Sequence, residues 1–338
     1  MPPFLQFLSR CVPALVWVGA SLFPPQGLAE EGLRPARLKN RIVVFGTKKQ
    51  DDGTYHTRIV SLSPLGEDLR LEATFSQGIQ RGRFAPDGGA LAYNTLAGSD
   101  DAAPPELWVM APGAAPRSLG RPGQLCGWRP DGGGLLCSRS VDPDQTRLDC
   151  VEVDLATGVE RTLGLPNNLV VQGWSGDGRA LLAFDPNPGR SFEDPQRGQY
   201  PLRQLVLWNI ETKSRATITE EDHDCIWPVA SPDGKQLAYY LRRHSGAPQE
   251  IMAVSEADGR NAREVISLIE RNGDEVIRPT GFPCWSPDGT EIAWLRTIRN
   301  KASGRTTWEI LVVVIAGSST RRIPLNDETG IGSIDWGR

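Results

Sequence analysis

The chain has 338 residues, of which 39% are hydrophobic and 23% are charged, a composition typical of a soluble globular protein with a large core. Its 36 glycines and 27 prolines favour many tight turns over long helices. The formal net charge of -4 gives no indication of binding to nucleic acid or to an anionic membrane surface, and we expect no nucleic-acid partner.

Residues 1–29 predict a secretory signal peptide. Arg10 precedes the apolar run CVPALVWVGASLF, which is too short to span a bilayer, and Gly27 and Ala29 provide the small residues that precede a cleavage site. We therefore expect cleavage before Glu30 and a periplasmic or secreted mature chain without a membrane span. The same residues leave open an N-terminal anchor that stays attached.

One short motif recurs along the rest of the chain. It is an Asp-Gly turn, preceded by Pro in four of five copies and followed by an apolar run such as LAYN or IAWL. Pro fixes φ at the first turn position, Asp accepts hydrogen bonds from N–H groups two residues on, and Gly tolerates positive φ, so each copy predicts a β-hairpin. The turn aspartates are 44, 46, 56 and 55 residues apart, a spacing typical of β-propeller blades: Asp87, Asp131, Asp177, Asp233 and Asp288.

Each hairpin is followed by a second pair of strands, so each repeat predicts four antiparallel strands. Three residues before each turn aspartate lies a position that is a large ring in four of five repeats, and we expect it to pack between neighbouring sheets: Phe84, Trp128, Trp174, Ala230 and Trp285. An arginine lies on every outermost strand, and we interpret these arginines as protection of an exposed sheet edge rather than as anion ligands: Arg117, Arg161, Arg215, Arg263 and Arg321.

The first repeat, from Arg41, lacks the turn motif and has only three predicted strands. The C-terminal SIDWGR supplies the fourth, with Trp336 in the ring position and Gly337 and Arg338 where the turn would begin. The chain therefore predicts an all-β, six-bladed β-propeller over residues 41–338, closed by the C-terminal strand pairing into the N-terminal blade. Closure removes the free sheet edges of an open stack. Residues 30–40 lead into this single domain.

The copies SPDGKQLAYY and WSPDGTEIAWL resemble the WD40-like Pro-Asp repeat of TolB-like β-propellers, which also occurs in propeller domains of dipeptidyl peptidase and prolyl oligopeptidase relatives. APDG and RPDG keep its turn, whereas SGDG at Ser175 lacks the proline. The resemblance covers nearly all of residues 41–338. It implies the fold, whereas propellers of this kind serve binding, scaffolding and catalysis alike.

Two departures from that family limit what the resemblance implies. TolB has an α/β domain ahead of its propeller, and about a dozen predicted mature residues precede the first blade of this chain, so contacts made by that domain are not carried over. The peptidase relatives have a hydrolase domain with a Gly-x-Ser-x-Gly elbow, which this chain lacks. Peptidase activity is therefore not supported.

The cysteines give no metal-binding pattern. With Cys11 removed in the signal peptide, an odd number remains, so at least one thiol stays unpaired. Cys126 and Cys137 flank a turn and could face each other across a hairpin, although cross-strand disulfides are geometrically demanding. We expect no metal and no cofactor, and the pairing stays open among five residues: Cys126, Cys137, Cys150, Cys225 and Cys284.

In a four-stranded blade, the connections between strands two and three and between successive blades lie on one face, which we call the loop-rich face. The short motif turns lie on the opposite face, the turn face. Long segments, which commonly carry binding function, fall on the loop-rich face at residues 185–203, 220–228 and 296–305, although charge runs of this kind are usually solvated loops. The partner-binding candidates on them are Asp222, His223, Asp224, Trp227, Phe192, Tyr200, Arg296 and Arg299.

His223 lies between Asp222 and Asp224 and could bind a divalent ion or act as a general acid–base. The chain has only two other histidines, His56 and His244, and neither is obviously close. We therefore assign no catalytic residue.

Three functions fit these observations. The favoured one is an exported, monomeric, non-catalytic propeller that binds a protein, peptide or envelope partner through its loop-rich face. The second is an enzyme of the polysaccharide lyase or cyclase type, with a site at the channel mouth near His223. The third is a regulatory propeller that acts beside a separate catalytic chain.

Overall fold

The computed structural model describes residues 35–50, 55–95, 105–111, 114–120, 123–140, 148–166, 169–194, 198–243, 249–317, 319–325 and 330–338. They form six antiparallel sheets, preceded by the short 3-10 helix η1 (Pro35–Leu38). The predicted six-bladed β-propeller is confirmed. The predicted signal peptide, residues 1–29, lies outside the described part of the chain. No helix within that part is long and apolar enough to cross a bilayer.

Blades 1 to 3 each have four strands, which follow one another from the axis outwards. Blade 1 contains β26 (Gly330–Trp336), β1 (Ile42–Lys49), β2 (Tyr55–Leu62) and β3 (Arg70–Phe75). Blade 2 contains β4 (Ile79–Phe84), β5 (Leu91–Thr95), β6 (Leu107–Met110) and β7 (Arg117–Ser118). Blade 3 contains β8 (Gln124–Trp128), β9 (Gly134–Ser140), β10 (Leu148–Asp154) and β11 (Glu160–Thr162).

Blades 4 and 5 repeat this arrangement, and blade 6 extends it. Blade 4 contains β12 (Val170–Trp174), β13 (Ala180–Asp194), β14 (Gly198–Asn209) and β15 (Arg215–Thr217). Blade 5 contains β16 (His223–Ala230), β17 (Gln236–Arg243), β18 (Gln249–Glu256) and β19 (Arg263–Ser267). Blade 6 contains β22 (Cys284–Trp285), β23 (Glu291–Asn300), β24 (Thr306–Val314) and β25 (Thr320–Leu325), and β20 (Glu270–Asn272) and β21 (Glu275–Pro279) lengthen it beside β23. The innermost strands contact one another in a closed circle: β26, β4, β8, β12, β16 and β22.

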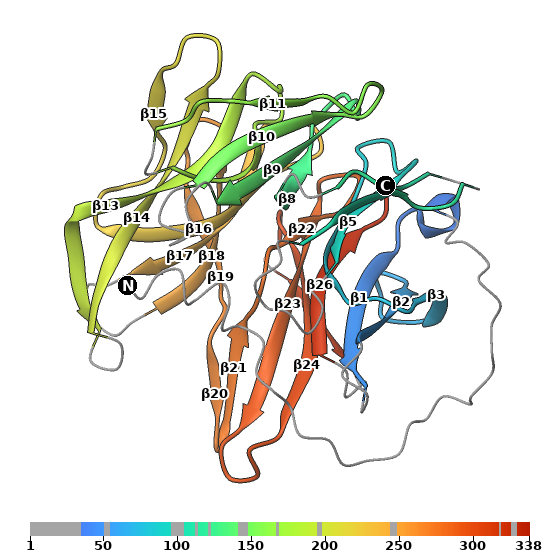
Figure 1. Cartoon of the computed structure of the whole chain (residues 1–338). Helices are drawn as coiled ribbons and strands as arrows, with labels where there is room; N and C mark the ends of the chain where they lie inside the picture. Colours follow the sequence, from blue (N-terminus) through green and yellow to red (C-terminus); the bar gives the residue numbers. More distant parts are fainter. Residues whose placement is uncertain are drawn as a thin grey trace.

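The two ends of the chain complete blade 1, as predicted. In Figure 1 the red strand β26 lies beside the blue strand β1, and Ile42 is the register partner of Trp336. Trp336 is 1% exposed, and its Nε1 donates to Asn40 Oδ1 at 3.3 Å. A Cβ on Gly88 would lie 2.2 Å from the carbonyl oxygen of Arg338, so the last residue packs against the first motif turn. Burial of this strand against both neighbouring blades stabilises the closed ring.

β26 also binds the inner strand of blade 2. Asp335 accepts a hydrogen bond from the N–H of Phe84 at 2.7 Å and pairs with the guanidinium of Arg83 at 3.2 Å. Ser333 Oγ accepts a hydrogen bond from the N–H of Gly82 at 3.3 Å. The C-terminal strand is therefore held on both sides, by β1 in its own sheet and by β4 in the next.

The motif turns have the predicted geometry. The N–H of Gly89 donates to Asp87 Oδ1 at 2.7 Å, and the other four turn aspartates make the equivalent bond. The glycine after each turn aspartate has a φ between 69° and 74°, a region that disfavours residues with a Cβ. These local features explain why the hairpins could be located from the motif.

Successive turns also contact one another around the ring. In the first four copies of the motif, the residue before the aspartate packs against the glycine of the next turn, and a Cβ on Gly178 would lie 3.5 Å from Pro130. In the repeat that lacks proline, a Cβ on Gly176 would lie 2.0 Å from the Cα of Gly234. The backbones approach too closely there for any side chain, which explains the departure from the Pro-Asp pattern.

The ring positions pack between blades, as predicted. Trp128 and Trp285 are 9% and 3% exposed. Each indole N–H donates to a backbone carbonyl of the preceding blade, Trp128 to Arg83 at 2.8 Å and Trp285 to Val229 at 3.1 Å. Trp128 and Trp285 therefore supply both apolar burial and a directional bond at the blade interfaces, whereas Trp174 supplies burial alone.

Three of the five outer-strand arginines connect neighbouring blades, whereas Arg161 and Arg215 pair with acids of their own blades. Arg117 donates to the carbonyl of Leu155 at 3.0 Å, and Arg263 donates to the carbonyl of Ile315 at 2.9 Å. Arg321 makes the equivalent contact from blade 6 to blade 1. Their effect on pairing between molecules stays a prediction.

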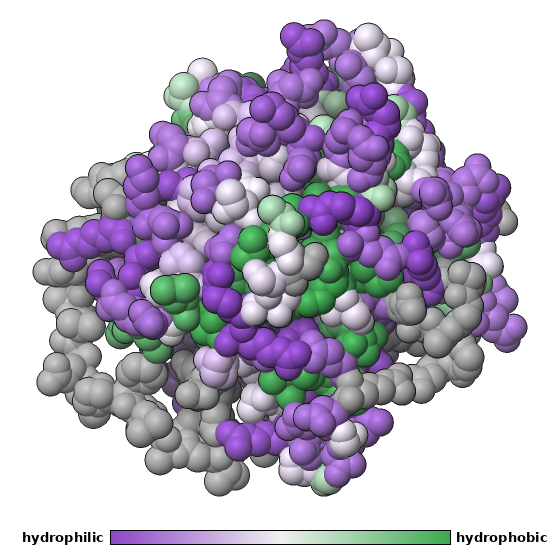
Figure 2. Space-filling model, turned by 180° about the vertical axis from the view of Figure 1, so that it is seen from behind, coloured by the Kyte–Doolittle hydropathy of each residue, from purple (hydrophilic) through white to green (hydrophobic). Residues whose placement is uncertain are grey.

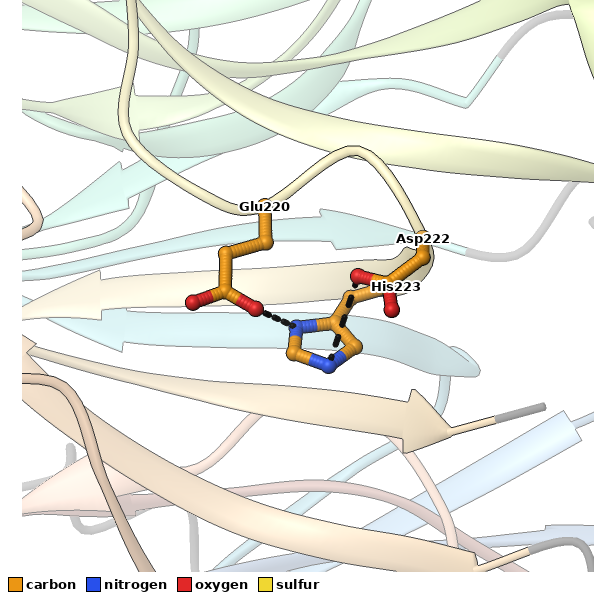
Figure 3. A group of neighbouring side chains, drawn as sticks. All are labelled: Glu220, Asp222 and His223. Carbon is orange, nitrogen blue, oxygen red and sulfur yellow. Dashed lines mark ion pairs between the residues drawn. The ribbon is translucent and has the colours of Figure 1, made fainter. Parts of the chain in front are cut away.

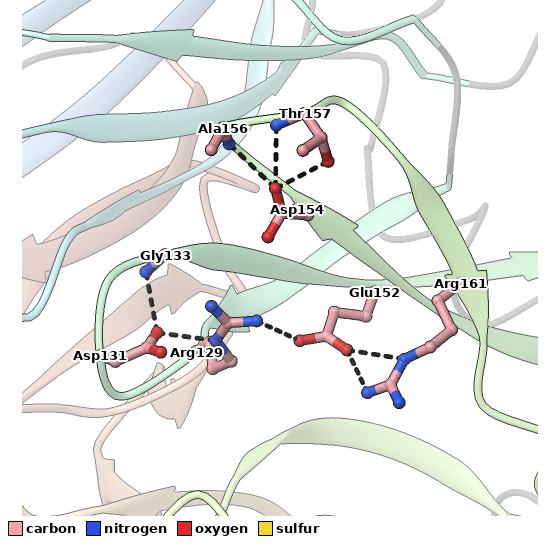
Figure 4. Close-up of polar contacts among 8 residues, drawn as sticks. All are labelled: Arg129, Asp131, Gly133, Glu152, Asp154, Ala156, Thr157 and Arg161. Atoms are coloured by element: carbon pink, nitrogen blue, oxygen red, sulfur yellow. Dashed lines mark hydrogen bonds and ion pairs between the residues drawn. The ribbon is translucent and has the colours of Figure 1, made fainter.

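A polar network in blade 3 shows how charges within a repeat are used (Figure 4). Glu152, whose side chain is 7% exposed, accepts a bond from Arg129 at 2.8 Å and pairs with Arg161 on the outer strand. Arg129 also donates to Asp131 at 2.7 Å, and this bond holds the pKa of the Asp131 carboxyl below its usual value. These charges stabilise the blade itself.

Cys126 and Cys137 do not form a cross-strand disulfide. A β-bulge makes Leu125, not Cys126, the register partner of Cys137. The thiol of Cys126 contacts the carbonyl oxygen of Val171 at 3.4 Å, on the blade 4 side of the sheet. Burial raises the pKa of the Cys126 thiol. All five cysteines in the described residues are free and buried: Cys126, Cys137, Cys150, Cys225 and Cys284.

The surface is largely hydrophilic in the view of Figure 2, with a hydrophobic area near its centre. Four large hydrophobic side chains among the described residues are strongly exposed, and three of them, Leu65, Leu69 and Leu71, belong to the outer part of blade 1. Leu65 and Leu69 lie in the turn between β2 and β3, and Leu71 lies at the start of β3, so all three lie toward the turn face rather than the loop-rich face.

Candidate functional site

Two of the three segments expected as loops on the loop-rich face are long β-hairpins. β13 and β14 continue past a register shift between Asn187 and Ser191, and Phe192 is the register partner of Tyr200. The expected loop over residues 185–203 is therefore wrong, because cross-strand pairing resumes beyond the Pro- and Gly-containing shift. Phe192 is partly buried on this hairpin. In Figure 1 the β13–β14 hairpin extends well beyond the other strands of its blade.

The expected basic loop over residues 296–305 is also mostly strand. β23 runs to Asn300 and β24 begins at Thr306, and β21 pairs with the far end of β23. Arg296 is fully buried, and its guanidinium pairs with Glu270 at 2.8 Å and with Glu309. Arg296 is therefore not available at the surface, since two carboxylates neutralise it inside the blade. Arg299, further along β23, is exposed.

Asp224 is likewise a buried structural residue. Its carboxylate is 0% exposed and pairs with Arg203 of β14 at 2.5 Å. It also accepts a hydrogen bond from the N–H of Arg203 at 3.2 Å. The pair joins blades 4 and 5 just inside the loop-rich face. Asp224 is therefore turned away from His223, its neighbour in sequence, as alternation along a strand requires.

His223, Asp222 and Glu220 form a cluster where the chain enters blade 5 (Figure 3). Glu220 Oε2 lies 3.7 Å from His223 Nδ1, and Asp222 Oδ1 lies 3.7 Å from Nε2. Both carboxylates are exposed, at 80% and 74%, whereas the imidazole is 15% exposed. One ligand atom from each residue falls within 4.8 Å of the others, so the three could hold a divalent cation.

Trp227 lies at the β-bulge of β16, with a positive φ of 55°. Its ring centroid is 5.5 Å from that of Tyr240, 6.1 Å from that of Phe282 and 6.3 Å from that of Trp294. Trp227 is partly buried, and these contacts place it in an aromatic cluster between blades 5 and 6. The bulge turns this side chain out of the regular alternation of the strand.

The structure also reveals a residue that the motif analysis missed, Arg81 of β4. Its Nη2 donates to the carbonyl of Cys126 in blade 3 at 3.2 Å, and its guanidinium carbon lies 3.9 Å from the ring centroid of Phe282 in blade 6. Blades 3 and 6 are opposite each other in a ring of six. The Arg81 side chain therefore lies near the centre of the ring, between blade 3 and Phe282.

Comparison of the five repeats could have identified Arg81 from the sequence. Arg81 lies six residues before its turn aspartate, where the other complete repeats have Leu125, Val171, Trp227 and Phe282. A cation at a position that is apolar in the other four repeats indicates that the surroundings of this side chain differ from those in the other blades. Its pKa is lowered to about 9, chiefly by burial and then by the neighbouring charge of Arg83.

Of the predicted site residues, Asp224 and Arg296 are buried in ion pairs, and the others lie on separate elements at the loop-rich face. Glu221, beside the His223 cluster, pairs with Arg190 of the β13–β14 hairpin, which links blade 4 to the start of blade 5. Tyr200 and Phe192 lie on that hairpin, and Arg299 lies on the long β23–β24 hairpin of blade 6. The loop-rich face therefore carries two projecting hairpins on either side of an acidic segment.

A groove of about 480 Å³ lies on the opposite face, between blades 2 and 3. Ala111, Ala114 and Ala115 of the β6–β7 connection line it, with Trp128 and Leu155. The short alanine side chains leave the space between the two blades unfilled. None of the predicted site residues lines this groove.

Comparison with solved structures confirms the architecture. TolB from Acinetobacter baumannii matches with a TM-score of 0.65 and 14% identity over 88% of this chain and 66% of that chain. The fold is TolB-like. The present chain spans just under two thirds of that TolB, and at this identity the likeness shows the fold alone. No protein-family model and no curated protein matches the chain in sequence.

Other propellers match less well. A putative TolB from Agrobacterium tumefaciens has a TM-score of 0.49 and 18% identity over 73% of this chain and 87% of that chain. An oligogalacturonate lyase in complex with manganese has a TM-score of 0.49 and 18% identity over 84% of this chain and 73% of that chain.

Proposed function

We propose that this chain is an exported, non-catalytic TolB-like propeller that binds a protein or peptide partner through its loop-rich face. The projecting hairpins of blades 4 and 6 support this proposal, because they flank the acidic segment that begins blade 5. Exposed Glu220 and Asp222 on that segment and exposed Arg299 on the blade 6 hairpin offer charges of both signs. Charges arranged in this way favour selective recognition of a polar partner surface.

The observation that carries the proposal is the pairing of the buried acids near this face. Asp224 pairs with Arg203, Glu250 pairs with Arg242 at 3.0 Å, and Glu309 pairs with Arg296. Their carboxylate oxygens are engaged inside the blades, where they stabilise the sheets that carry the hairpins. The charged groups left at the surface are on the rim, which suits recognition better than proton transfer at a shielded centre.

A capture experiment from envelope extract tests this proposal. The purified chain should retain a defined partner, and the Glu220→Lys, Asp222→Lys double variant should lose most of it. Glu211→Lys is the matched control, since Glu211 is exposed in the β14–β15 turn on the turn face. Equal capture by all three proteins would contradict binding at the loop-rich face.

The second candidate is an enzyme with its site near His223. The observation that favours it is the cluster of Glu220, Asp222 and His223, with ligand atoms within 4.8 Å of one another. Under the binding proposal, His223→Ala leaves the melting temperature nearly unchanged and abolishes no reaction. Loss of a measurable cleavage of acidic oligosaccharide, with the melting curve unchanged, would favour the enzyme instead.

A further inference from the structure

A buried cation near the centre of the ring has no ion-pair partner among the described residues. Arg81 is 8% exposed, and its Nε has no hydrogen-bond partner. No carboxylate of the described residues lies within ion-pair distance of its guanidinium. Asp335, whose charge acts on Arg81, is itself paired with Arg83 and with the N–H of Phe84. A buried guanidinium without a countercharge is costly, and such groups call for a specific explanation.

Three other buried arginines of the ring have their charge neutralised by a carboxylate. Arg203, Arg242 and Arg296 are each 6% exposed or less and have a carboxylate partner within their own or the adjoining blade. Arg81 departs from this pattern although Arg83, on the same strand, adds a second positive charge beside it. The guanidinium of Arg83 lies 5.6 Å from the ring of Phe282, which Arg81 also contacts.

The position of Arg81 relates it to the loop-rich face. β4 runs from that face toward the motif turn at Asp87, and Arg81 is its third residue, in the half nearer the loop-rich face. Phe282, from the segment that leads into blade 6, contacts it, and Trp227 of blade 5 contacts Phe282 in turn. One cation and two aromatic rings thus lie in contact near the axis of the ring.

We propose that Arg81 receives a carboxylate group of the bound partner, inserted along the axis from the loop-rich face. The inference rests on the proposed function and adds the chemistry of the anchoring group. A planar guanidinium matches a carboxylate through paired N–H donors, and the rings of Phe282 and Trp227 suit an apolar body next to that carboxylate. A phosphate dianion fits less well, because it would need a second cation and the guanidinium of Arg83 is already paired with Asp335.

Small probes test this assignment by isothermal titration of the full chain. N-acetyl-L-phenylalanine carries a terminal carboxylate, N-acetyl-L-aspartic acid amide carries a side-chain carboxylate, and N-acetyl-L-phenylalaninamide carries none. We expect at least one carboxylate probe to bind about tenfold more tightly than the amide and than inorganic phosphate. The carboxylate probe that binds more tightly shows whether Arg81 prefers the carboxylate of a chain terminus or that of an acidic side chain.

Variants connect the binding to Arg81. Arg81→Gln should weaken binding of the carboxylate probe about tenfold, whereas Lys213→Gln, which removes an exposed cation from the β14–β15 turn on the turn face, should change it less than about twofold. If Arg81→Gln does not fold, Arg81→Lys keeps the charge but loses the paired donors and should still weaken binding. Equal affinity in the wild type and the Arg81 variant, or tighter binding of phosphate, would overturn the assignment.

Failure of this inference is distinguishable from failure of the proposed function. If the partner is captured through the rim but no carboxylate probe depends on Arg81, the axial anchor is wrong and the binding face stands. If carboxylates bind at Arg81 but no partner is captured, the anchor stands and the proposed partner binding fails.

Discussion

Trp336 of the last strand lies opposite Ile42 of the first, and both side chains are essentially buried. Deleting residues 333–338 removes this pairing together with the burial of Ile334 and Trp336. We expect the deletion to lower the free energy of unfolding by about 5 kcal/mol or more, because burial of the two side chains alone is worth several kcal/mol. Urea denaturation followed by tryptophan fluorescence measures the effect. A truncated chain that unfolds at the same urea concentration as the full chain would refute closure by β26.

The close approach of Gly176 and Gly234 predicts that Gly176 does not tolerate a side chain, although the other four repeats have proline at this position. Gly176→Ala should destabilise the chain by about 1–3 kcal/mol, because the added Cβ would collide with the backbone of the next turn. Gly173→Ala, on the inner strand of the same blade, is the matched control, since nothing lies within 4 Å of its Cβ position. Thermal denaturation of the two variants compares them directly. Equal melting temperatures would show that the turns do not pack in this way.

Much of the fold could be predicted because its determinants are local. The turn at Asp87 depends on residues within two positions, and the same holds for each copy of the motif. The C-terminal strand could be assigned because Trp336 falls in a position that recurs in the repeats.

The site was less predictable because its contacts are distant in sequence. Pro186, Pro188 and Gly189 indicated a loop, yet the β13–β14 pairing resumes beyond them. Arg296 depends on Glu270 and Glu309, which lie 26 and 13 residues away. The axial position of Arg81 exists only once six blades surround it, and no pattern within one repeat specifies that assembly.

Substitution of Asp224 tests whether this predicted site residue stabilises the fold or binds the partner. Asp224→Asn should cost about 3 kcal/mol or more, because it leaves the buried Arg203 without its countercharge. Glu160→Gln breaks the exposed pair with Arg139 and should cost less than about 1 kcal/mol. Denaturant unfolding of both variants measures the difference. If Asp224→Asn is as stable as the wild type but loses partner capture, Asp224 belongs to the binding surface instead.

The charge state of Arg81 predicts a pH dependence for carboxylate binding. Its pKa is lowered to about 9, so the guanidinium loses its proton at a lower pH than an ordinary arginine and binding should decline as the pH rises through about 9. The other groups that act on Arg81 are Arg83, Asp335, Cys126 and Cys137, and burial raises the pKa of both thiols.

The same shift has the opposite sign for stability. The folded chain binds fewer protons at Arg81 than the unfolded chain above about pH 9, so the cost of burying the charge is relieved as the pH rises. Titration of the carboxylate probe between about pH 7 and pH 10, in the wild type and in Arg81→Gln, isolates the contribution of this residue to binding. A residual affinity in Arg81→Gln that declines as steeply as that of the wild type would assign the dependence to another group.

Hydrogen–deuterium exchange of the chain with and without its captured partner tests the binding face most directly. The account predicts slower exchange in the β13–β14 and β23–β24 hairpins and in the segment that carries His223, with no change in the five motif turns. Protection confined to the turn face, for example at the groove between blades 2 and 3, would contradict it.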